Sequence, residues 1–249
     1  MIIIKTDSEV KIMREAGRIV AKAHDEVRKA IRVGISTMEL ATVAEQTIKH
    51  YGAIPSFKNY NGFPGAICVS VNNEVIHGIP SKHRILADGD IVKIDIGALY
   101  KGYHGDSAKT HAVGNVSSLA ADLIDITKKS FYKAIQFAKE GKRLNDISSA
   151  VEDIVVKHGF SVVRDYVGHG VGMNLHEDPE VPNFRMGMQG PRLQKGMVLA
   201  IEPMINAGEP YVESLDDGWT VVTCDGSLSS HYEHTIAITD AEPIILTAL

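Results

Sequence analysis

Four acidic side chains stand in stretches of sequence that are otherwise apolar. Asp95 and Asp106 lie eleven positions apart in the first half of the chain, and Glu202 and Glu233 lie in the second half. An ionised carboxylate that is buried without a partner is strongly unfavourable. Few lysines or arginines occupy matching positions, so divalent metal ions are the simplest partners for these four acids.

The spacing of Asp95 and Asp106 predicts that they face one another. If residues 99–102 form the turn of a hairpin, the two acids pair directly across it, with Cβ atoms about 5 Å apart. Two carboxylates at that separation repel one another unless a proton or a cation lies between them. The hairpin therefore predicts a cation-binding pair.

His169 is the fifth candidate ligand, in the segment Gly168-His169-Gly170-Val171-Gly172. The glycines let the backbone crowd a bulky group and leave the imidazole unhindered. Four carboxylates and one histidine suit two mid-sized cations such as Mn, Fe, Co or Zn better than a single structural zinc. Taken singly, each acid is more often a turn or edge residue, and the histidine an ordinary loop residue; the joint pattern favours metal.

Composition bounds the class of protein. The chain has 249 residues, 44% of them hydrophobic, enough for one or two globular domains. The formal net charge of −5 gives no case for a specific nucleic-acid partner. Cys68 and Cys224 are too few for a disulfide framework, and no apolar run reaches the ~20 residues that span a bilayer. We expect a cytoplasmic protein with no membrane association.

Two pairs of helices repeat along the chain. A helical rhythm over 8–31 precedes a second helix that ends at Gly52, and helices over 119–138 and up to Gly159 follow the same layout. Ser36 with Glu39 predicts a capping box, and Asn145 is the expected cap of the fourth helix. The glycines that bound the second and fourth helices are offset by 107 positions. Chance agreement is an alternative, but an internal duplication explains the pattern better.

Strand candidates follow each pair of helices with short connections, which favours an α+β fold over alternating βαβ units. We expect a single catalytic domain, 1–249, with internal halves of about 1–115 and 116–249. The expected strands are 67–71, 90–99, 103–113, 161–167, 196–205, 219–223 and 232–239.

The five candidate ligands, in this order and spacing, resemble the dinuclear site of the pita-bread metallopeptidases. The segment Asn72–Pro80 and the lack of a long insert in the second half are similar to the type I methionine aminopeptidases, in their short bacterial-type form. The resemblance implies a fold of two pseudo-symmetric halves with two divalent metal ions between them. It implies that Asp106 and Glu233 bridge both ions, that Asp95 completes one, and that His169 and Glu202 complete the other.

The resemblance also implies a reaction, the removal of the initiator methionine from nascent proteins whose second residue is small, by a hydroxide that the metal pair activates. Glu202 is then the expected general base, His77 contacts the scissile amide nitrogen, and His176 stabilises the oxyanion. His77 also belongs to the expected methionine pocket. The other residues expected in that pocket are Tyr60, Phe63, Cys68 and Trp219. Read alone, the two histidines fit ordinary loop positions and the pocket residues fit core packing.

Two positions depart from the family's pattern: Phe57 stands where a smaller residue is common and Leu175 where Phe is common. They affect the expected shape of the pocket and leave the metal ligands untouched. The partners implied are nascent polypeptides with an N-terminal Met, together with a transient ribosome contact, and the expected state is a monomer. Two rival functions remain, a dipeptidase that cleaves before proline and a non-catalytic member of the fold that binds proteins or RNA.

Overall fold

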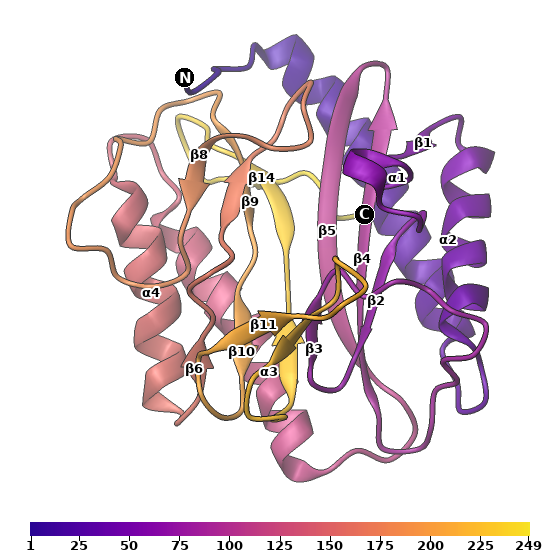
Figure 1. Cartoon of the computed structure of the whole chain (residues 1–249). Helices are drawn as coiled ribbons and strands as arrows, with labels where there is room; N and C mark the ends of the chain where they lie inside the picture. Colours follow the sequence, from indigo (N-terminus) through magenta and orange to yellow (C-terminus); the bar gives the residue numbers. More distant parts are fainter.

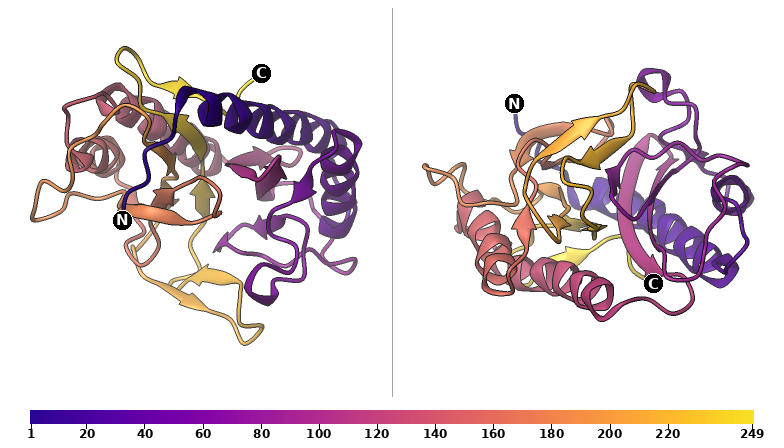
Figure 2. Two further views of the ribbon diagram at one scale, coloured as in Figure 1. Left: turned by 90° about the horizontal axis from the view of Figure 1, so that it is seen from above. Right: turned by 60° about the horizontal axis from the view of Figure 1, so that its bottom comes forward.

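The computed structural model describes residues 1–249, the whole chain. Helices cover the outer faces and strands fill the middle, as the three ribbon views show (Figures 1 and 2). The four α-helices are α1 Asp7–Ala30, α2 Thr37–His50, α3 Ser118–Ala134 and α4 Leu144–Lys157, and two short 3-10 helices span Tyr60–Gly62 and Ile135–Phe137.

The helix starts follow local capping chemistry, with one correction. Ser36 and Glu39 form the expected capping box at α2, where the backbone N–H of Ser36 donates to the Glu39 carboxylate at 2.9 Å. Asn145 is not the cap of α4, because it lies inside the helix. The backbone N–H of Arg143 instead donates to the Asp146 carboxylate at 2.8 Å. The acid at the third helical position therefore provides a hydrogen-bond acceptor for the residue that precedes the helix.

The strands are short apart from one long hairpin, and all pairs are antiparallel. The first five are β1 Ile54–Pro55, β2 Cys68–Val71, β3 Glu74–Ile76, β4 Ile91–Tyr100 and β5 Tyr103–Ala112. The next five are β6 Ser161–Val162, β7 Gly168–Gly170, β8 Glu177–Val181, β9 Val198–Ile201 and β10 Met204–Asn206. The last five are β11 Val212–Ser214, β12 Val221–Thr223, β13 Ser229–His231, β14 His234–Ala237 and β15 Ile244–Ile245.

Two predicted strands are interrupted at candidate ligands. The run 196–205 divides into β9 and β10 at Glu202 and Pro203, because a proline has no N–H to donate to a neighbouring strand. The run 232–239 becomes β14 only after Glu233, and the separate strand β13 precedes it. Both glutamates therefore lie at breaks between strands.

The β4–β5 hairpin forms, but its register differs from the prediction. Tyr100 pairs with Tyr103, so the loop is Lys101-Gly102, and both loop residues have positive φ (48° and 83°). Two-residue loops of this kind favour glycine. The predicted turn would have had Tyr100 and Lys101 as its central residues, and neither of them is glycine. Asp106 is consequently opposite Gly97 and not opposite Asp95. The offset of two positions keeps the two acids on one face of the sheet.

The two halves of the molecule meet where β5 lies against the segment that leads into β14. The backbone N–H of Glu233 donates to Ala108 O at 2.8 Å, and Ser107 Oγ donates to Glu233 O at 2.8 Å. Asp106 N donates to Thr235 Oγ1 at 3.0 Å. The first half contributes a sheet in which β4 pairs with β1, β2 and β5, and the second half a sheet in the order β15-β14-β9-β7-β8.

Backbone hydrogen bonds repeat between the halves with the offset found in the sequence. Gly34 N donates to Leu86 O at 2.8 Å, and Gly141 N, 107 positions later, donates to Leu193 O at 2.9 Å. The same offset relates two isolated bridges, Ser36 with Ile85 and Arg143 with Arg192. These repeats agree with the pseudo-symmetric halves expected from the sequence.

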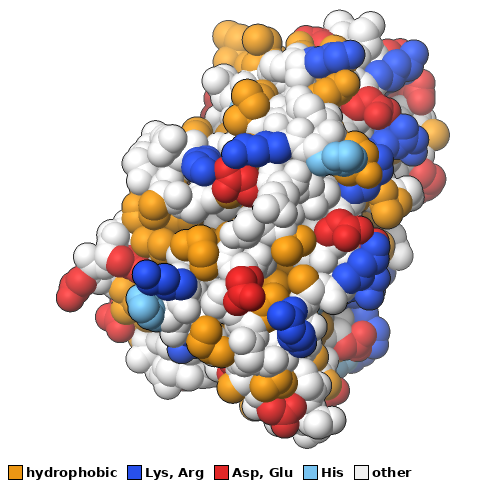
Figure 3. All heavy atoms as spheres, turned by 90° about the vertical axis from the view of Figure 1, so that its right-hand side faces the viewer, with side chains coloured by type: hydrophobic (Ala, Val, Ile, Leu, Met, Phe, Trp, Pro, Cys, Tyr) orange, Lys and Arg blue, Asp and Glu red, His pale blue; other side chains and the backbone are white.

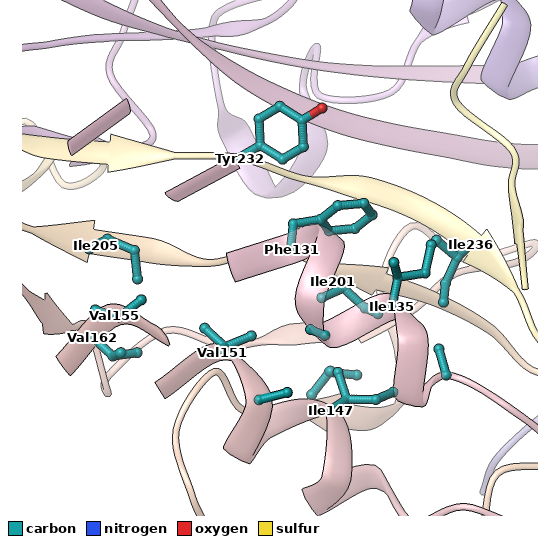
Figure 4. Close-up of a cluster of buried hydrophobic side chains, with 14 of the residues drawn as sticks. Phe131, Ile135, Ile147, Val151, Val155, Val162, Ile201, Ile205, Tyr232 and Ile236 are labelled. Atoms are coloured by element: carbon teal, nitrogen blue, oxygen red, sulfur yellow. The ribbon is translucent and has the colours of Figure 1, made fainter. Parts of the chain in front are cut away.

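Each half has its own apolar core. In the second half, a cluster of 24 buried residues lies between α3, α4 and the strands, and Phe131, Ile147 and Ile201 are among its members (Figure 4). In the first half, 19 buried residues join α1 and α2 to β2 and β4. α1 approaches β5 so closely that a Cβ on Gly105 would be 2.8 Å from the backbone nitrogen of Gly17.

The outer surface mixes charges of both signs. On the face shown in Figure 3, Lys and Arg side chains lie beside Asp and Glu side chains. The ion pairs of the surface include Lys49–Glu45 and Lys58–Glu45. None of the helices combines the length and apolar character needed to cross a bilayer.

Candidate metal centre and substrate cavity

A cavity of about 740 Å³ collects all the site residues expected from the sequence. It is lined by segments from both halves of the chain. The expected residues found in its wall are Tyr60, Phe63, Cys68, His77, Asp95, Asp106, His169, His176, Glu202, Trp219 and Glu233. No candidate lies elsewhere.

Strands or their ends carry the five candidate ligands. Asp95 is on β4, Asp106 on β5 and His169 on β7, whereas Glu202 directly follows β9 and Glu233 directly precedes β14. Ligand atoms of Asp106, His169 and Glu233 lie within 4.8 Å of one another. Rigid strands from both halves thus fix the relative positions of the potential ligands.

The carboxylates lack the partners that a buried charge needs. Asp95 Oδ1, Asp106 Oδ1 and Glu233 Oε1 are buried and accept no hydrogen bond. Burial raises the pKa of Asp106 to about 7 and raises the pKa values of Asp95, Glu202 and Glu233 well above their usual range. A divalent cation would satisfy the unpaired oxygens and reverse these shifts. The residues present therefore fit a divalent metal centre.

His169 is prepared as a neutral ligand. Its Nδ1–H donates to Gly170 O at 2.9 Å, so Nε2 carries the free lone pair. Nε2 lies 3.5 Å from Glu202 Oε1, and burial lowers the pKa of His169 to about 3. A Cβ on Gly168 would be 2.3 Å from Ala200 O, which explains why glycine stands beside the histidine. The hydrogen bond at Nδ1 and the lowered pKa of the ring both favour coordination of a metal ion through Nε2.

Two further histidines border the carboxylates. The hydroxyl of Tyr60 and Nδ1 of His176 are 2.9 Å apart, and the His176 ring lies 4.2 Å from the His169 ring, centroid to centroid. His77 has a left-handed backbone (φ 59°), and its ring stands at 90° to the ring of Tyr166 at 5.9 Å. Burial lowers the pKa of His77 to about 4 and also lowers the pKa of His176. Both rings are therefore neutral near pH 7.

An apolar recess adjoins the acids. Its buried cluster consists of Phe57, Phe63, Cys68 and Leu175. The partly buried side chains that pack against this cluster are Tyr60, Ile79 and Trp219. Cys68 pairs with Asp95 across β2 and β4, so the recess and the ligands share two neighbouring strands. Phe57 lies under the hairpin, where a Cβ on Gly97 would be 2.6 Å from its ring.

The sequence did not reveal every polar residue around the centre. His231 is 1% exposed, neither ring nitrogen has a hydrogen-bond partner, and its Nε2 lies 3.5 Å from Glu202 Oε2. It precedes Glu233 by two positions, so the period of a strand could have identified it. Glu177, in contrast, lines the cavity itself, and only its position next to His176 pointed to it.

Comparison with known proteins identifies the family. The model of metallopeptidase family M24 matches residues 11–240. Methionine aminopeptidase 1 of Bacillus subtilis is 60% identical over 247 residues, which cover 99% of each chain. The crystal structure of methionine aminopeptidase from Thermotoga maritima superposes with a TM-score of 0.98 at 46% identity, covering 100% of both chains. A prolidase from Pyrococcus furiosus reaches 0.80 at 27% identity and covers 99% of this chain and 66% of its own.

The chain belongs to metallopeptidase family M24, whose pita-bread fold was implied by the resemblance of the five candidate ligands to that family's site. Within that family, its full-length similarity identifies it as a methionine aminopeptidase of type I, as the sequence motifs predicted. Membership of the family also establishes that the enzyme uses divalent metal.

Proposed function

We propose that this chain removes the initiator methionine from nascent polypeptides, acting on the free N-terminus. The observation that carries the proposal is the adjacency of two features in one cavity. Unpaired carboxylates with His169 form a cation site, and the apolar recess begins one strand away at Cys68. An exopeptidase needs this combination, because the N-terminal residue must be recognised beside the group that cleaves its peptide bond.

The centre takes two divalent cations, because four carboxylates and one imidazole exceed what a single ion requires. Asp106 and Glu233 would hold both ions, Asp95 would hold one of them, and His169 with Glu202 would hold the other. Oxygen ligands with one nitrogen suit Mn, Fe, Co or Zn. When bound, the ions supply Lewis-acid activation of a water molecule and an anchor for the substrate's α-amine.

Three side chains handle protons and charge during the reaction. Glu202 acts as the general base, because it faces both the cavity and His169. When Tyr60 donates to Nδ1 of His176, the neutral ring carries its proton on Nε2 and can donate it to the developing oxyanion. His77 contacts the nitrogen of the scissile amide.

The apolar recess receives the methionine side chain. Phe63 and Trp219 meet edge to face, with ring centroids 5.2 Å apart, and Cys68 and Tyr60 lie beside them. A thioether packs well against aromatic edges and sulfur. Phe57 and Leu175 also line the cavity and belong to the same buried cluster, so both limit the volume of the recess.

A rigid wall limits the second residue of the substrate. Gly78, next to His77, is held against β2: its N–H donates to Ser70 Oγ at 3.0 Å, and its carbonyl accepts from Val69 N at 2.9 Å. A Cβ on Gly78 would be 2.3 Å from Val69 O, so the segment cannot retreat. A large second side chain would be compressed there, which favours substrates that begin Met-Ala, Met-Gly or Met-Ser.

Residues 1–249 act as one catalytic domain, because the ligands come from both halves and meet at their junction. All ligands come from a single chain, so catalysis needs no second copy and we propose a monomer. We propose further that it acts in the cytoplasm, where a transient contact with the ribosome would bring it to emerging N-termini.

A series of tripeptides Met-X-Ser, assayed at saturating metal, tests this function. We expect kcat/KM to fall by at least about 100-fold from X = Ala to X = Leu, Phe or Lys, since each tenfold corresponds to about 1.4 kcal/mol in the transition state. Leu-Ala-Ser should be cleaved much more slowly than Met-Ala-Ser. A flat profile across X would point to a broad-range aminopeptidase, and preferential cleavage of Met-Pro would favour the dipeptidase.

A further inference from the structure

An ion pair between the N-terminal segment and β8 is buried next to the cavity. Lys5 Nζ lies 2.5 Å from Glu177 Oε2, and both side chains are only 3% exposed. Figure 1 shows the N-terminus beside β8, and the first view of Figure 2 agrees. Other ion pairs between lysine or arginine and acids of this protein are much more exposed, for example Lys139–Glu242 at 38% and 76%.

The chain around this pair leaves little freedom for either partner. Lys5 N donates to Gly196 O at 2.8 Å, and Lys5 Nζ donates also to Ile3 O at 3.1 Å. Glu177 Oε1 accepts from Asn174 N at 3.2 Å. A Cβ on Gly172 would be 2.3 Å from that same oxygen. Glycine at this position, three residues after His169, therefore makes room for the carboxylate.

The position of Glu177 connects the pair to the catalytic residues. Glu177 directly follows His176, lines the cavity, and pairs with Gly170 across β7 and β8. Its carboxylate closes the turn that begins at Asn174, and this turn presents the His176 ring to Tyr60 and the metal centre. Whatever fixes Glu177 therefore fixes His176.

We propose that Lys5 is a positioning residue for His176, an inference that rests on the oxyanion role given to His176 above. Lys5 neutralises the Glu177 carboxylate, which would otherwise add an unpaired negative charge to the cavity that the metal-ligand acids line. Buried ion pairs contribute little net stability compared with apolar replacements, so their value is more often in fixing geometry. Lys5, 171 positions from His176, thereby sets the angle at which that histidine meets the substrate.

Three variants and one control test the proposal. Lys5→Met leaves the buried Glu177 carboxylate without a cationic partner, Lys5→Arg keeps the positive charge, and Lys5→Met with Glu177→Leu removes both charges. Lys139→Met is the matched control, because it breaks an ion pair that also joins distant segments and neither of its two residues lines the cavity. All are assayed on Met-Ala-Ser at saturating metal and at a temperature where circular dichroism shows them folded.

We expect Lys5→Met to lower kcat by about 10–100-fold with KM changed less than about threefold, the size typical of losing a supporting contact to an active group. Lys5→Arg should retain kcat within about threefold, and Lys139→Met should match the unmodified enzyme. If Lys5→Met does not fold, the double variant carries the test, and it should lose about tenfold in kcat. Full kcat in the double variant would overturn the proposal.

A measurement without substrate separates this inference from the proposed function. In imidazole-selective NMR spectra of the metal-loaded protein, the His176 resonances should shift in Lys5→Met and stay unchanged in Lys139→Met. If Lys5→Met lowers only the melting temperature, with kcat and the His176 resonances unaltered, the pair is merely structural and the inference fails. If the unmodified enzyme does not cleave Met-Ala-Ser, the proposed function fails, whereas the NMR comparison still decides the positioning role.

Discussion

At the scale of single residues, the sequence indicated buried functional side chains where a polar residue stands among apolar neighbours. Asp95, Asp106, Glu202 and Glu233 stood out because an acid in an apolar strand needs a partner, and all four line the cavity. His231 escaped notice because its neighbours are polar, and only its spacing of two positions from Glu233 could have pointed to it. Only the fold shows that it faces Glu202.

Replacing Asp106 by Asn should separate stability from activity. The change removes a buried charge while keeping the volume, so the metal-free protein should melt at the same or a higher temperature. Cleavage of Met-Ala-Ser should fall by at least about 10³-fold, roughly 4 kcal/mol in the transition state, because the expected bridging oxygen is lost. The exposed Asp153→Asn serves as control. Retention of activity in Asp106→Asn with added metal would refute the dinuclear assignment.

His176→Ala should reduce kcat by about 10²–10³-fold and leave KM nearly unchanged, since a donor to the oxyanion acts mainly in the transition state. Tyr60→Phe removes the hydroxyl beside Nδ1 and should cause a smaller loss of the same kind. The exposed His158→Ala is the comparison variant. Steady-state kinetics decide the matter: a change confined to KM would make His176 a binding residue.

At the scale of elements, hydrophobic periodicity located the helices and the long hairpin, whereas the register depended on turn chemistry. The predicted loop placed Asp95 opposite Asp106; the observed loop, Lys101-Gly102, uses the residue that tolerates positive φ and moves Asp106 opposite Gly97. The predicted strand 161–167 continues past the end of β6, and β7 was not predicted, because the sequence does not mark where a strand gains or loses its partner. Those partners come from distant parts of the chain.

Gly105→Ala tests how closely α1 supports the hairpin that carries Asp106. The added methyl would sit 2.8 Å from Gly17 N, and overpacking of this kind costs about 1–3 kcal/mol. Because Asp106 is the next residue, metal affinity should weaken as well. Gly187→Ala, where no atom lies within 4 Å, is the control. Chemical denaturation and isothermal titration with Mn²⁺ provide both quantities; an unchanged variant would show that the helix does not constrain the strand.

At the scale of the whole molecule, the offset of 107 between glycines predicted two similar halves, and repeated hydrogen bonds agree with it. The same offset separates Asp95 from Glu202, so the duplication relates two of the acids as well. Sequence alone did not show that β5 meets the segment before β14, because backbone pairing between Ala108 and Glu233 is specified by neither residue locally. This junction brings the ligands together.

The effect of metal on stability should grow with pH. Burial raises the folded-state pKa of Asp106 to about 7 and raises those of Asp95, Glu202 and Glu233, whereas the unfolded values are about 4. In the metal-free protein their contribution to stability is present below about pH 4 and is lost as the pH rises through the folded-state values. Bound cations keep the carboxylates ionised and remove that loss.

The increase in melting temperature on adding Mn²⁺ to chelator-treated protein should therefore be larger at pH 8 than at pH 5. Buried histidines that do not bind metal, such as His24, change stability with pH in the opposite direction, because burial lowers their pKa. Their contribution is present both with and without Mn²⁺, so most of it cancels when the two melting temperatures at one pH are subtracted. Differential scanning fluorimetry over this range measures it. An increment that shrinks with rising pH would contradict the placement of the carboxylates around a cation.

The most direct test of the central claim is the release of free methionine from Met-Ala-Ser by chelator-treated protein before and after metal is restored, with N-acetyl-Met-Ala-Ser as the matched substrate. The account predicts no release without metal, recovery on adding Mn²⁺ or Co²⁺, and no cleavage of the acetylated peptide, because its amine can no longer be anchored. Release of methionine in excess chelator, or equal cleavage of the acetylated peptide, would contradict it.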